Sequence, residues 1–126
     1  MAEPVKLLVV DDEAMFVKGL ADFLTQCGYS VAVAFDGHQA IEQMKTHQPA
    51  LTLMDLKLPG PNGEELVRQA KQVSPGTKLI VLTAYHDEGE KEAVLRQAGV
   101  SGYLYKPLKS LVELEQLIET TLKRCG

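Results

Sequence analysis

Four short apolar runs in this chain each end on side chains that could hold a phosphoryl group and a divalent cation. The runs cover residues 7–10, 51–54, 79–82 and 103–105. The residues that follow or close them are Asp11 with Asp12, Asp55, Thr83, and Lys106. If the runs are parallel strands, three carboxylates, one hydroxyl and one ammonium meet at one edge of one sheet, where open α/β sheets bind ligands.

The three carboxylates would repel one another, so a cluster of this kind needs a counter-charge. Asp11, Asp12 and Asp55 carry a summed charge of −3, which Lys106 reduces to −2 and a divalent cation would bring to zero. Carboxylate oxygens without His or Cys favour Mg²⁺ or Mn²⁺ over Zn²⁺. Adjacent acids can also cap a helix start, and for the first pair alone both interpretations stand. The residues at the other strand ends favour the metal site.

A carboxylate beside a metal, a hydroxyl donor and an ammonium can accept a phosphoryl group. In that chemistry Asp55 attacks in line, and the metal and Lys106 neutralise the charge on the equatorial oxygens. The Thr83 hydroxyl would donate a hydrogen bond to one of those oxygens once they arrive.

The elements that must position these residues alternate along the chain. Near-continuous apolar runs predict strands, and apolar residues three and four apart predict helices. The predicted strands cover residues 5–10, 29–35, 50–54, 77–82 and 102–105. The predicted helices cover residues 13–27, 39–47, 62–73, 87–99 and 110–124. This alternation predicts right-handed βαβ crossovers and an α/β fold, with a doubly wound, five-stranded parallel sheet and helices on both faces.

The second predicted strand differs from the other four because it ends without a candidate site residue. The segment Phe35 to His38 that follows it is typical of a helix-capping turn. We therefore expect this strand at the sheet edge, in the flavodoxin-like order 2-1-3-4-5. The crevice then lies between the first and third strands.

Length and charge narrow the class of protein. A chain of 126 residues predicts a single domain over residues 1–126, with no room for a second module. A net charge of −4 argues against nucleic-acid binding or an anionic membrane surface. No apolar stretch has the length of a membrane span and no secretory signal is visible, so we expect a cytoplasmic protein. Cys27 and Cys125 match no metal-ligand spacing and are expected to be reduced thiols.

Taken together, the motifs resemble those of the receiver domain of two-component response regulators, and the likeness covers essentially the whole chain. The motifs are Asp11-Asp12, Asp55-Leu56-Lys57-Leu58-Pro59 with Asn62-Gly63, Thr83-Ala84, and Lys106-Pro107. Each motif is weakly specific by itself, but the combination is strongly specific.

The resemblance assigns roles to individual residues. It implies that Asp55 is the phosphoacceptor and a metal ligand, that Asp12 is a direct Mg²⁺ ligand, and that Asp11 holds metal-bound water. The backbone carbonyl of Lys57 would complete the metal ligands supplied by the protein.

The phosphoryl oxygens and the response to them involve three further residues. By the same resemblance, Thr83 and Lys106 would hold the phosphoryl oxygens. Tyr103, three residues before the lysine, matches an aromatic switch that packs inward when Thr83 is drawn to the phosphate.

The resemblance also implies the function. A sensor histidine kinase or a histidine phosphotransfer protein would present a phosphohistidine, and the chain would transfer the phosphoryl group to Asp55 in a Mg²⁺-dependent reaction. The chain would catalyse only its own phosphorylation and dephosphorylation, so it is expected to be a signalling domain rather than an enzyme. Partner binding would change through the face from the fourth strand to the fifth helix, and a dimer that depends on phosphorylation is a further expectation.

Some positions depart from the common pattern or vary among similar domains. Pro61 stands where an apolar residue is usual. Lys57 and Tyr85 lie two residues beyond Asp55 and Thr83, at positions that tune phosphoryl lifetime in similar domains. A cation and a bulky ring there could hinder an attacking water, which gives the hypothesis of slow self-dephosphorylation. The alternative is that both side chains point to solvent and have little effect.

Two other classes of function stay open on the sequence. A Mg²⁺-dependent phosphatase with an aspartyl-phosphate intermediate would carry a D-x-D pair on the first strand and a substrate cap. A nucleotide- or flavin-binding module would carry a glycine-rich loop there. This chain has Asp11-Asp12-Glu13 at that point and no insertion. Turnover of a phosphate ester would favour the first class, and a co-purifying nucleotide the second.

Overall fold

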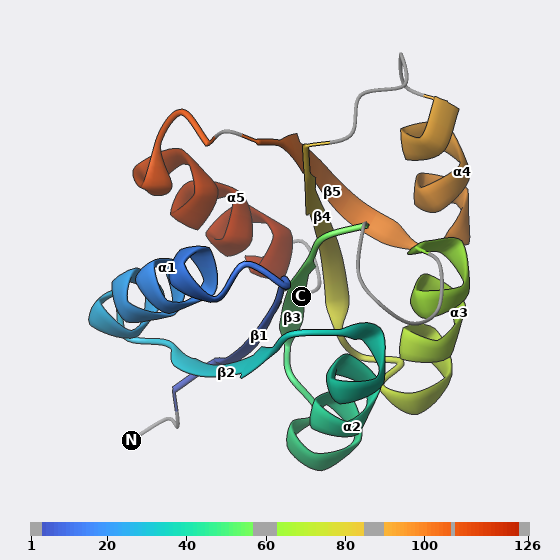
Figure 1. Ribbon diagram of the computed structural model, residues 1–126, viewed down its shortest axis with the longest axis horizontal. Helices are drawn as coiled ribbons and strands as arrows, with labels where there is room; N and C mark the ends of the chain where they lie inside the picture. The colour runs from blue at the N-terminus through green and yellow to red at the C-terminus, as the bar shows by residue number, and fades with distance from the viewer. Residues whose placement is uncertain (1–3, 57–62, 85–89, 107, 124–126) are drawn as a thin grey trace.

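The computed structural model describes residues 4–56, 63–84, 90–106 and 108–123, and it confirms the predicted alternation of strands and helices (Figure 1). Along the chain the elements are β1 (Lys6–Val10), α1 (Ala14–Gln26), β2 (Ser30–Ala34), α2 (Gly37–His47), β3 (Leu51–Met54), α3 (Gly63–Val73), β4 (Lys78–Thr83), α4 (Glu90–Ala98), β5 (Val100–Tyr105) and α5 (Leu111–Lys123).

The five strands form one parallel sheet in the order β2-β1-β3-β4-β5, as the sequence predicts. β1 pairs with β2 on one side and with β3 on the other, so the chain reverses its direction of winding at β1. In doubly wound sheets a ligand crevice lies at this reversal, beyond the carboxyl ends of the strands.

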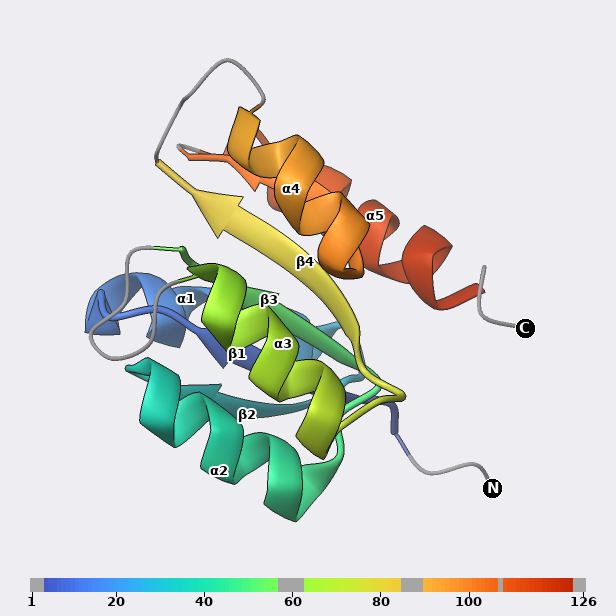
Figure 2. The same cartoon turned by 90° about the vertical axis from the view of Figure 1, so that its right-hand side faces the viewer.

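Helices cover both faces of the sheet. The views in Figures 1 and 2 show α1 and α5 on one face and α2, α3 and α4 on the other. Alternate residues of β1 point to opposite faces of the sheet. Leu8 and Val10 pack in the core beneath α2, α3 and α4, whereas Leu7 and Val9 pack beneath α1 and α5. This alternation is the two-residue period of a strand that is buried on both faces.

Side chains determine where several elements begin. α2 begins at Gly37, two residues before the predicted start, because the Gln39 N–H donates to Asp36 Oδ1 at 2.8 Å and caps the helix. β5 also begins earlier than predicted, at Val100, two residues before the predicted start, and no side-chain cap accounts for this difference among the described contacts. The predicted cap of α5 is confirmed by a 3.2 Å hydrogen bond from the Glu113 N–H to Ser110 Oγ.

Some sequence predictions fall on residues that the structure does not describe. They include the proposed starts of the third and fourth helices at residues 62 and 87, and the thiol of Cys125. Among the described residues, Cys27 is a free and exposed cysteine. Among the helices in the described ranges, none combines the length and the apolar character needed to cross a bilayer.

Candidate functional site

The backbone of the sheet fixes two of the three candidate carboxylates. Val10 of β1 pairs with Met54 of β3, so the residues that follow them, Asp11 and Asp55, leave neighbouring strands at the same level. The Asp55 N–H donates to Val10 O at 3.0 Å, and the Asp11 N–H donates to Ala34 O at 3.1 Å. The sheet ladder therefore continues one residue beyond each strand and holds both residues in place.

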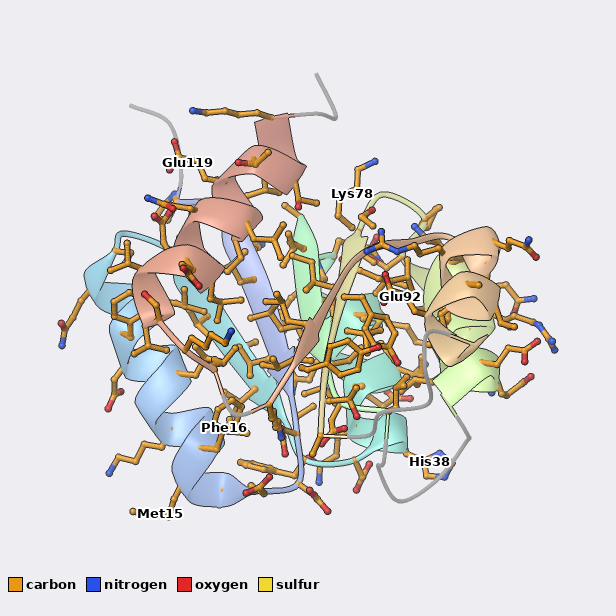
Figure 3. The ribbon with its side chains drawn as sticks, turned by 90° about the horizontal axis from the view of Figure 1, so that it is seen from above. Met15, Phe16, His38, Lys78, Glu92 and Glu119 are labelled. Carbon is orange, nitrogen blue, oxygen red and sulfur yellow. The ribbon has the colours of Figure 1, made fainter. Side chains whose placement is uncertain are left out.

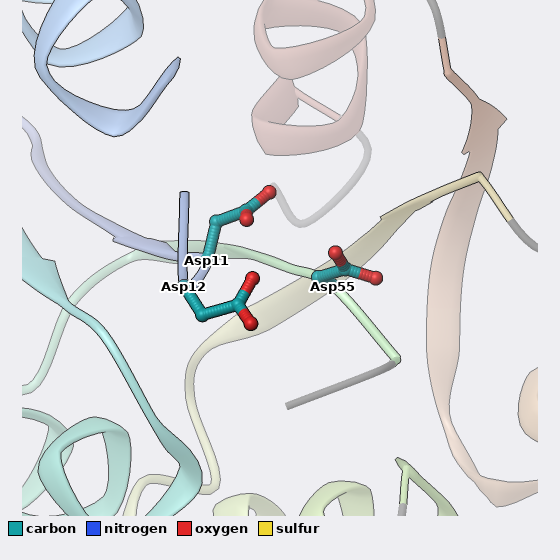
Figure 4. A group of neighbouring side chains, drawn as sticks. All are labelled: Asp11, Asp12 and Asp55. Atoms are coloured by element: carbon teal, nitrogen blue, oxygen red, sulfur yellow. The ribbon is translucent and has the colours of Figure 1, made fainter. Parts of the chain in front are cut away.

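The three predicted acids form one cluster at this edge. Asp11, Asp12 and Asp55 each offer a carboxylate oxygen, and these oxygens lie within 4.8 Å of one another (Figure 4). Asp11 and Asp55 are buried, whereas Asp12 is exposed. Three hard oxygen donors at this spacing, open on one side, fit a Mg²⁺ or Mn²⁺ ion, which keeps several waters when it binds to proteins.

Lys106 supplies the positive charge at the cluster. Its Nζ donates to Asp11 Oδ2 at 2.5 Å and to Asp55 Oδ2 at 3.3 Å, and its side chain is only 11% exposed. The Lys106 backbone N–H donates to Thr83 O at 2.8 Å, so the end of β4 positions the lysine. The ammonium thus bridges the carboxylates that follow β1 and β3.

Burial and the neighbouring charges both shift the pKa values of Asp11 and Lys106. Burial raises the pKa of Asp11 above its usual value, and the nearby charge of Asp55 adds to this, against the hydrogen bonds from Lys106 and the Glu13 N–H. Burial also works against the charge of Lys106, but its hydrogen bonds to Asp11 and Glu13 outweigh burial and raise its pKa. An ion pair alone would lower the pKa of Asp11, so the raised value reflects a buried acid among like charges. Lys106 stays charged because three carboxylates surround it.

Thr83 and Tyr103 lie on the last two strands, β4 and β5. Thr83 closes β4 and is fully buried, and its register partner on β5 is Tyr105. Tyr103, two residues earlier on β5, is 8% exposed and its ring centroid lies 5.2 Å from that of Tyr105, at an interplanar angle of 53°. The side chain predicted to act as a switch is therefore packed inward in this structure.

Two residues of the site were missed by the sequence reasoning. Glu13 Oε1 accepts a hydrogen bond from Lys106 Nζ at 3.2 Å, and the Phe16 ring centroid lies 4.6 Å from the same nitrogen. Figure 3 labels Phe16 at the start of α1, where its neighbour Met15 is 85% exposed. The sequence did carry one signal for Glu13: a glutamate stands at the start of the helix, where Ser, Thr, Asp or Asn is the preferred N-cap.

The predicted residues Lys57, Pro61, Tyr85 and Pro107 lie outside the described ranges. The structure brings together the residues at the ends of β1, β3, β4 and β5, which the sequence placed on one edge.

Comparison with known proteins identifies the family. The family model described as the response regulator receiver domain matches residues 7–119. The transcriptional regulatory protein PdtaR of Mycobacterium tuberculosis is 35% identical over 126 residues, covering 98% of this chain and 59% of that protein. The response regulator MprA of Mycolicibacterium vanbaalenii is 35% identical over 121 residues, covering 96% of this chain and 52% of that protein. The chain thus spans between half and three fifths of these two relatives.

Solved structures give the same result. A CheY-like response regulator receiver domain protein from Methanospirillum hungatei superposes with a TM-score of 0.89 at 28% identity, over 96% of this chain and 95% of that one. The receiver domain of response regulator 1452 from Francisella superposes with a TM-score of 0.85 at 27% identity, over 97% and 99%. The family match covers most of the chain and agrees with the strand order and the site described above. This chain belongs to the response regulator receiver domain family of two-component signalling.

Proposed function

We propose that the chain is a phosphoryl-accepting switch and that Asp55 is its acceptor. The observation that carries the proposal is the position of the Asp55 carboxylate. It lies at the carboxyl end of β3, with an oxygen within 4.8 Å of those of Asp11 and Asp12 and 3.3 Å from Lys106 Nζ. An acceptor needs both a cation site and a fixed positive charge at such distances.

The acidic cluster would hold a Mg²⁺ or Mn²⁺ ion. Asp12, the exposed member, is the proposed direct ligand, Asp55 the second, and Asp11 would hold metal-bound water. The backbone carbonyl of Lys57 is proposed as a further ligand from the family resemblance. When bound, the ion supplies positive charge that reduces repulsion between the carboxylates and an incoming phosphoryl group.

In the proposed reaction an oxygen of Asp55 attacks the phosphorus of a phosphohistidine in line. A phosphorus–oxygen bond forms as the phosphorus–nitrogen bond breaks, and the electron pair of the broken bond stays on the imidazole. The imidazole leaves as a neutral group when its other nitrogen carries a proton. Lys106 would hold one phosphoryl oxygen with its ammonium, and the Thr83 hydroxyl would donate a hydrogen bond to another.

The added charge would then change the surface of the domain. Thr83 and Tyr103 lie on the paired strands β4 and β5, and both are buried, so a displacement of Thr83 toward the phosphoryl group would change the packing around β5. We infer that phosphorylation shifts an existing equilibrium of the face from β4 to α5, which binds or releases a partner.

The partners follow from this chemistry. A sensor histidine kinase or a histidine phosphotransfer protein would be the donor, and a phosphorylation-dependent dimer is one proposed output. Within this proposal residues 1–126 act as a single cytoplasmic receiver domain that modifies only itself. Direct binding to nucleic acid or membrane is not part of the proposal, since the net charge is −4.

The test is intact-protein mass spectrometry after incubation with acetyl phosphate and Mg²⁺. We expect one phosphoryl adduct in the wild type, none in Asp55→Asn, and none when EDTA replaces the metal. Asp22→Asn removes an exposed carboxylate on α1 and serves as the matched control, which should still form the adduct. An adduct of undiminished yield in Asp55→Asn would refute the assignment of the acceptor.

A further inference from the structure

Glu13 occupies the N-cap of α1 but does not cap it. Its backbone is extended, with φ −87° and ψ 97°, and its side chain makes no hydrogen bond to the first turn. Residues at this position usually accept a hydrogen bond from the second or third N–H of the helix. The carboxylate of Glu13 is therefore available for another contact.

That contact is with Lys106. Glu13 Oε1 lies 3.2 Å from Lys106 Nζ, and the Glu13 backbone N–H donates to Asp11 Oδ1 at 3.0 Å. Lys106 Nζ in turn donates to Asp11 Oδ2. The three residues close a ring of hydrogen bonds in which Asp11 uses one oxygen for each neighbour, so the position of the ammonium depends on Glu13 as well as on the acidic cluster.

Phe16 forms the floor beneath the ammonium. It lies three residues after Glu13, about one helical turn, and its ring centroid is 4.6 Å from Lys106 Nζ. A cation at this distance from an aromatic ring is attracted to the ring quadrupole. The start of α1 thus offers Lys106 two contacts in addition to those with Asp11 and Asp55.

We propose that Glu13 is a positioning residue for Lys106: it holds the ammonium against α1 and competes with the acceptor site for it. The second half of this proposal rests on the proposed function, because it assumes that Lys106 contacts a phosphoryl group on Asp55. Glu13 would then limit how readily Lys106 moves toward that group.

The alternative is that Glu13 and Lys106 form a surface ion pair that does not affect the position of the ammonium, since the Glu13 side chain is 65% exposed. Exposed pairs contribute little because water screens them and two long side chains must be ordered. Here one partner is already ordered: the Lys106 side chain is 11% exposed and is held by two other carboxylates. Only Glu13 loses freedom in forming the contact.

The first experiment measures how firmly Lys106 is held, without metal or phosphoryl donor. The protein is treated briefly with an N-hydroxysuccinimide ester, and the acylation of each lysine is measured by peptide mass spectrometry. We expect Glu13→Gln to raise the labelling of Lys106 on the order of threefold, as for the loss of one partly exposed ion pair. Lys6 and Lys78 are internal standards, and Glu42→Gln, which breaks an exposed pair with Lys45 on α2, is the matched control.

The second experiment separates position from charge. Glu13→Gln keeps the length of the side chain and removes its charge, whereas Glu13→Asp keeps the charge on a side chain one methylene shorter. If Glu13 competes for Lys106, both variants should reach half-maximal phosphorylation at a severalfold lower acetyl phosphate concentration than the wild type. If Glu13→Gln needs as much acetyl phosphate as the wild type, the competition is refuted. If Glu13→Asp alone behaves like the wild type, the competition stands but the need for the full side-chain length is refuted.

The two experiments can fail independently. Unchanged labelling of Lys106 in Glu13→Gln would overturn the positioning role, even if Asp55 proves to be the acceptor. Raised labelling with no phosphoryl adduct in any variant would leave the positioning role intact and remove the proposed function. Thermal unfolding of each variant by circular dichroism confirms that the lysines are compared in folded proteins.

Discussion

Asp11 is the most enclosed acid of the cluster, and its two oxygens already have donors. One oxygen accepts from the Glu13 N–H and the other from Lys106 Nζ. Its buried position nevertheless raises its pKa, with burial as the largest cause and the charge of Asp55 as a further one. The folded protein therefore tolerates the charge of Asp11 less well than the unfolded chain does, and its stability falls as the pH rises from the ordinary carboxyl pKa to the raised one.

Neutralising this residue should stabilise the protein when no metal is present. Asp11→Asn keeps an oxygen for Lys106, removes one like charge and loses the hydrogen bond from the Glu13 N–H, so we expect a net rise of about 1 kcal/mol in the free energy of unfolding and of about 3–6 °C in the melting temperature in EDTA. Thermal unfolding followed by circular dichroism measures this. Asp22→Asn on α1 is the control and should change little, whereas a marked loss of stability in Asp11→Asn would contradict the prediction.

Phosphoryl lifetime is also a residue-scale property. Lys57 and Tyr85 lie two positions beyond Asp55 and Thr83, outside the described residues, and the hypothesis that they hinder water stays a prediction. We expect the wild-type adduct to persist for minutes or longer in Mg²⁺ buffer, and Lys57→Ala with Tyr85→Ala to shorten its lifetime severalfold. A time course of intact mass after removal of acetyl phosphate measures both, and wild-type decay within seconds would disprove the hypothesis.

Among the elements, β2 and α5 are linked by one side-chain hydrogen bond. Tyr29, just before β2, donates its hydroxyl to Glu115 Oε2 of α5 at 2.9 Å. Burial, together with this hydrogen bond, raises the pKa of Tyr29 from 10.0 to about 12. Because the neutral phenol is favoured in the folded state, the contact stabilises the fold below pH 10, and this contribution is lost as the pH rises toward 12.

Tyr29→Phe should remove this link without changing the packing of the ring. We expect a loss of about 1 kcal/mol in the free energy of unfolding at neutral pH. In a titration followed by tyrosine absorbance at 295 nm, the variant should lack one late-ionising phenol. Glu115→Gln, which keeps an acceptor but removes the charge, should shift that ionisation to lower pH, and identical titrations of the two variants and the wild type would contradict the assignment.

The ends of α2 and α3 are joined by a residue in a strained conformation. Gln48, the C-cap of α2, has φ 45° and ψ 62°, and its Nε2 donates to Met44 O at 3.0 Å and to Val73 O at 2.9 Å. A left-handed backbone is costly for a residue with a Cβ, so the side-chain bonds must offset that cost.

A matched pair of substitutions separates the cost of the left-handed backbone from the stabilisation by the side-chain hydrogen bonds. Gln48→Ala keeps the strain and loses the side-chain hydrogen bonds to Met44, Lys45 and Val73, so we expect it to destabilise the fold by about 1–2 kcal/mol. Gln48→Gly loses the bonds but relieves the strain, so it should be less destabilising than alanine by about 1 kcal/mol. Urea unfolding of both variants gives the comparison, and equal stabilities would mean that the backbone carries no strain.

For the molecule as a whole, the proposed binding of a metal ion at the acidic cluster would add to stability. An ion that binds only the folded state adds about 2.7 kcal/mol at a concentration one hundred times its dissociation constant. We expect the melting temperature of the wild type to rise continuously with Mg²⁺ concentration, and Asp12→Asn to weaken this rise strongly because it removes the exposed member of the cluster. KCl at the same ionic strength is the control, and an equal rise of the melting temperature with KCl would contradict a specific site.

The arrangement of the whole sheet was predictable because each central strand is apolar on both faces and ends on a polar residue. The order of strands followed from β2, whose end carries no candidate site residue. Element boundaries were less accurate where a side chain decides them, as Asp36 does for α2. The contact of Glu13 with Lys106 joins residues 93 positions apart and depends on how α1 lies against the end of β5, which no local pattern encodes.

The continuation of the sheet ladder beyond β1 and β3 has a consequence for timing. The main-chain hydrogen bonds of Asp11 and Asp55 hold the two carboxylates in place before any donor or metal arrives. The loss of chain entropy needed to bring these charges together is therefore complete once the protein has folded. If Asp55 is the acceptor, the latency of the response contains no step that brings the chain segments of Asp11 and Asp55 together; metal binding, diffusion of the donor and movement of Lys106 remain.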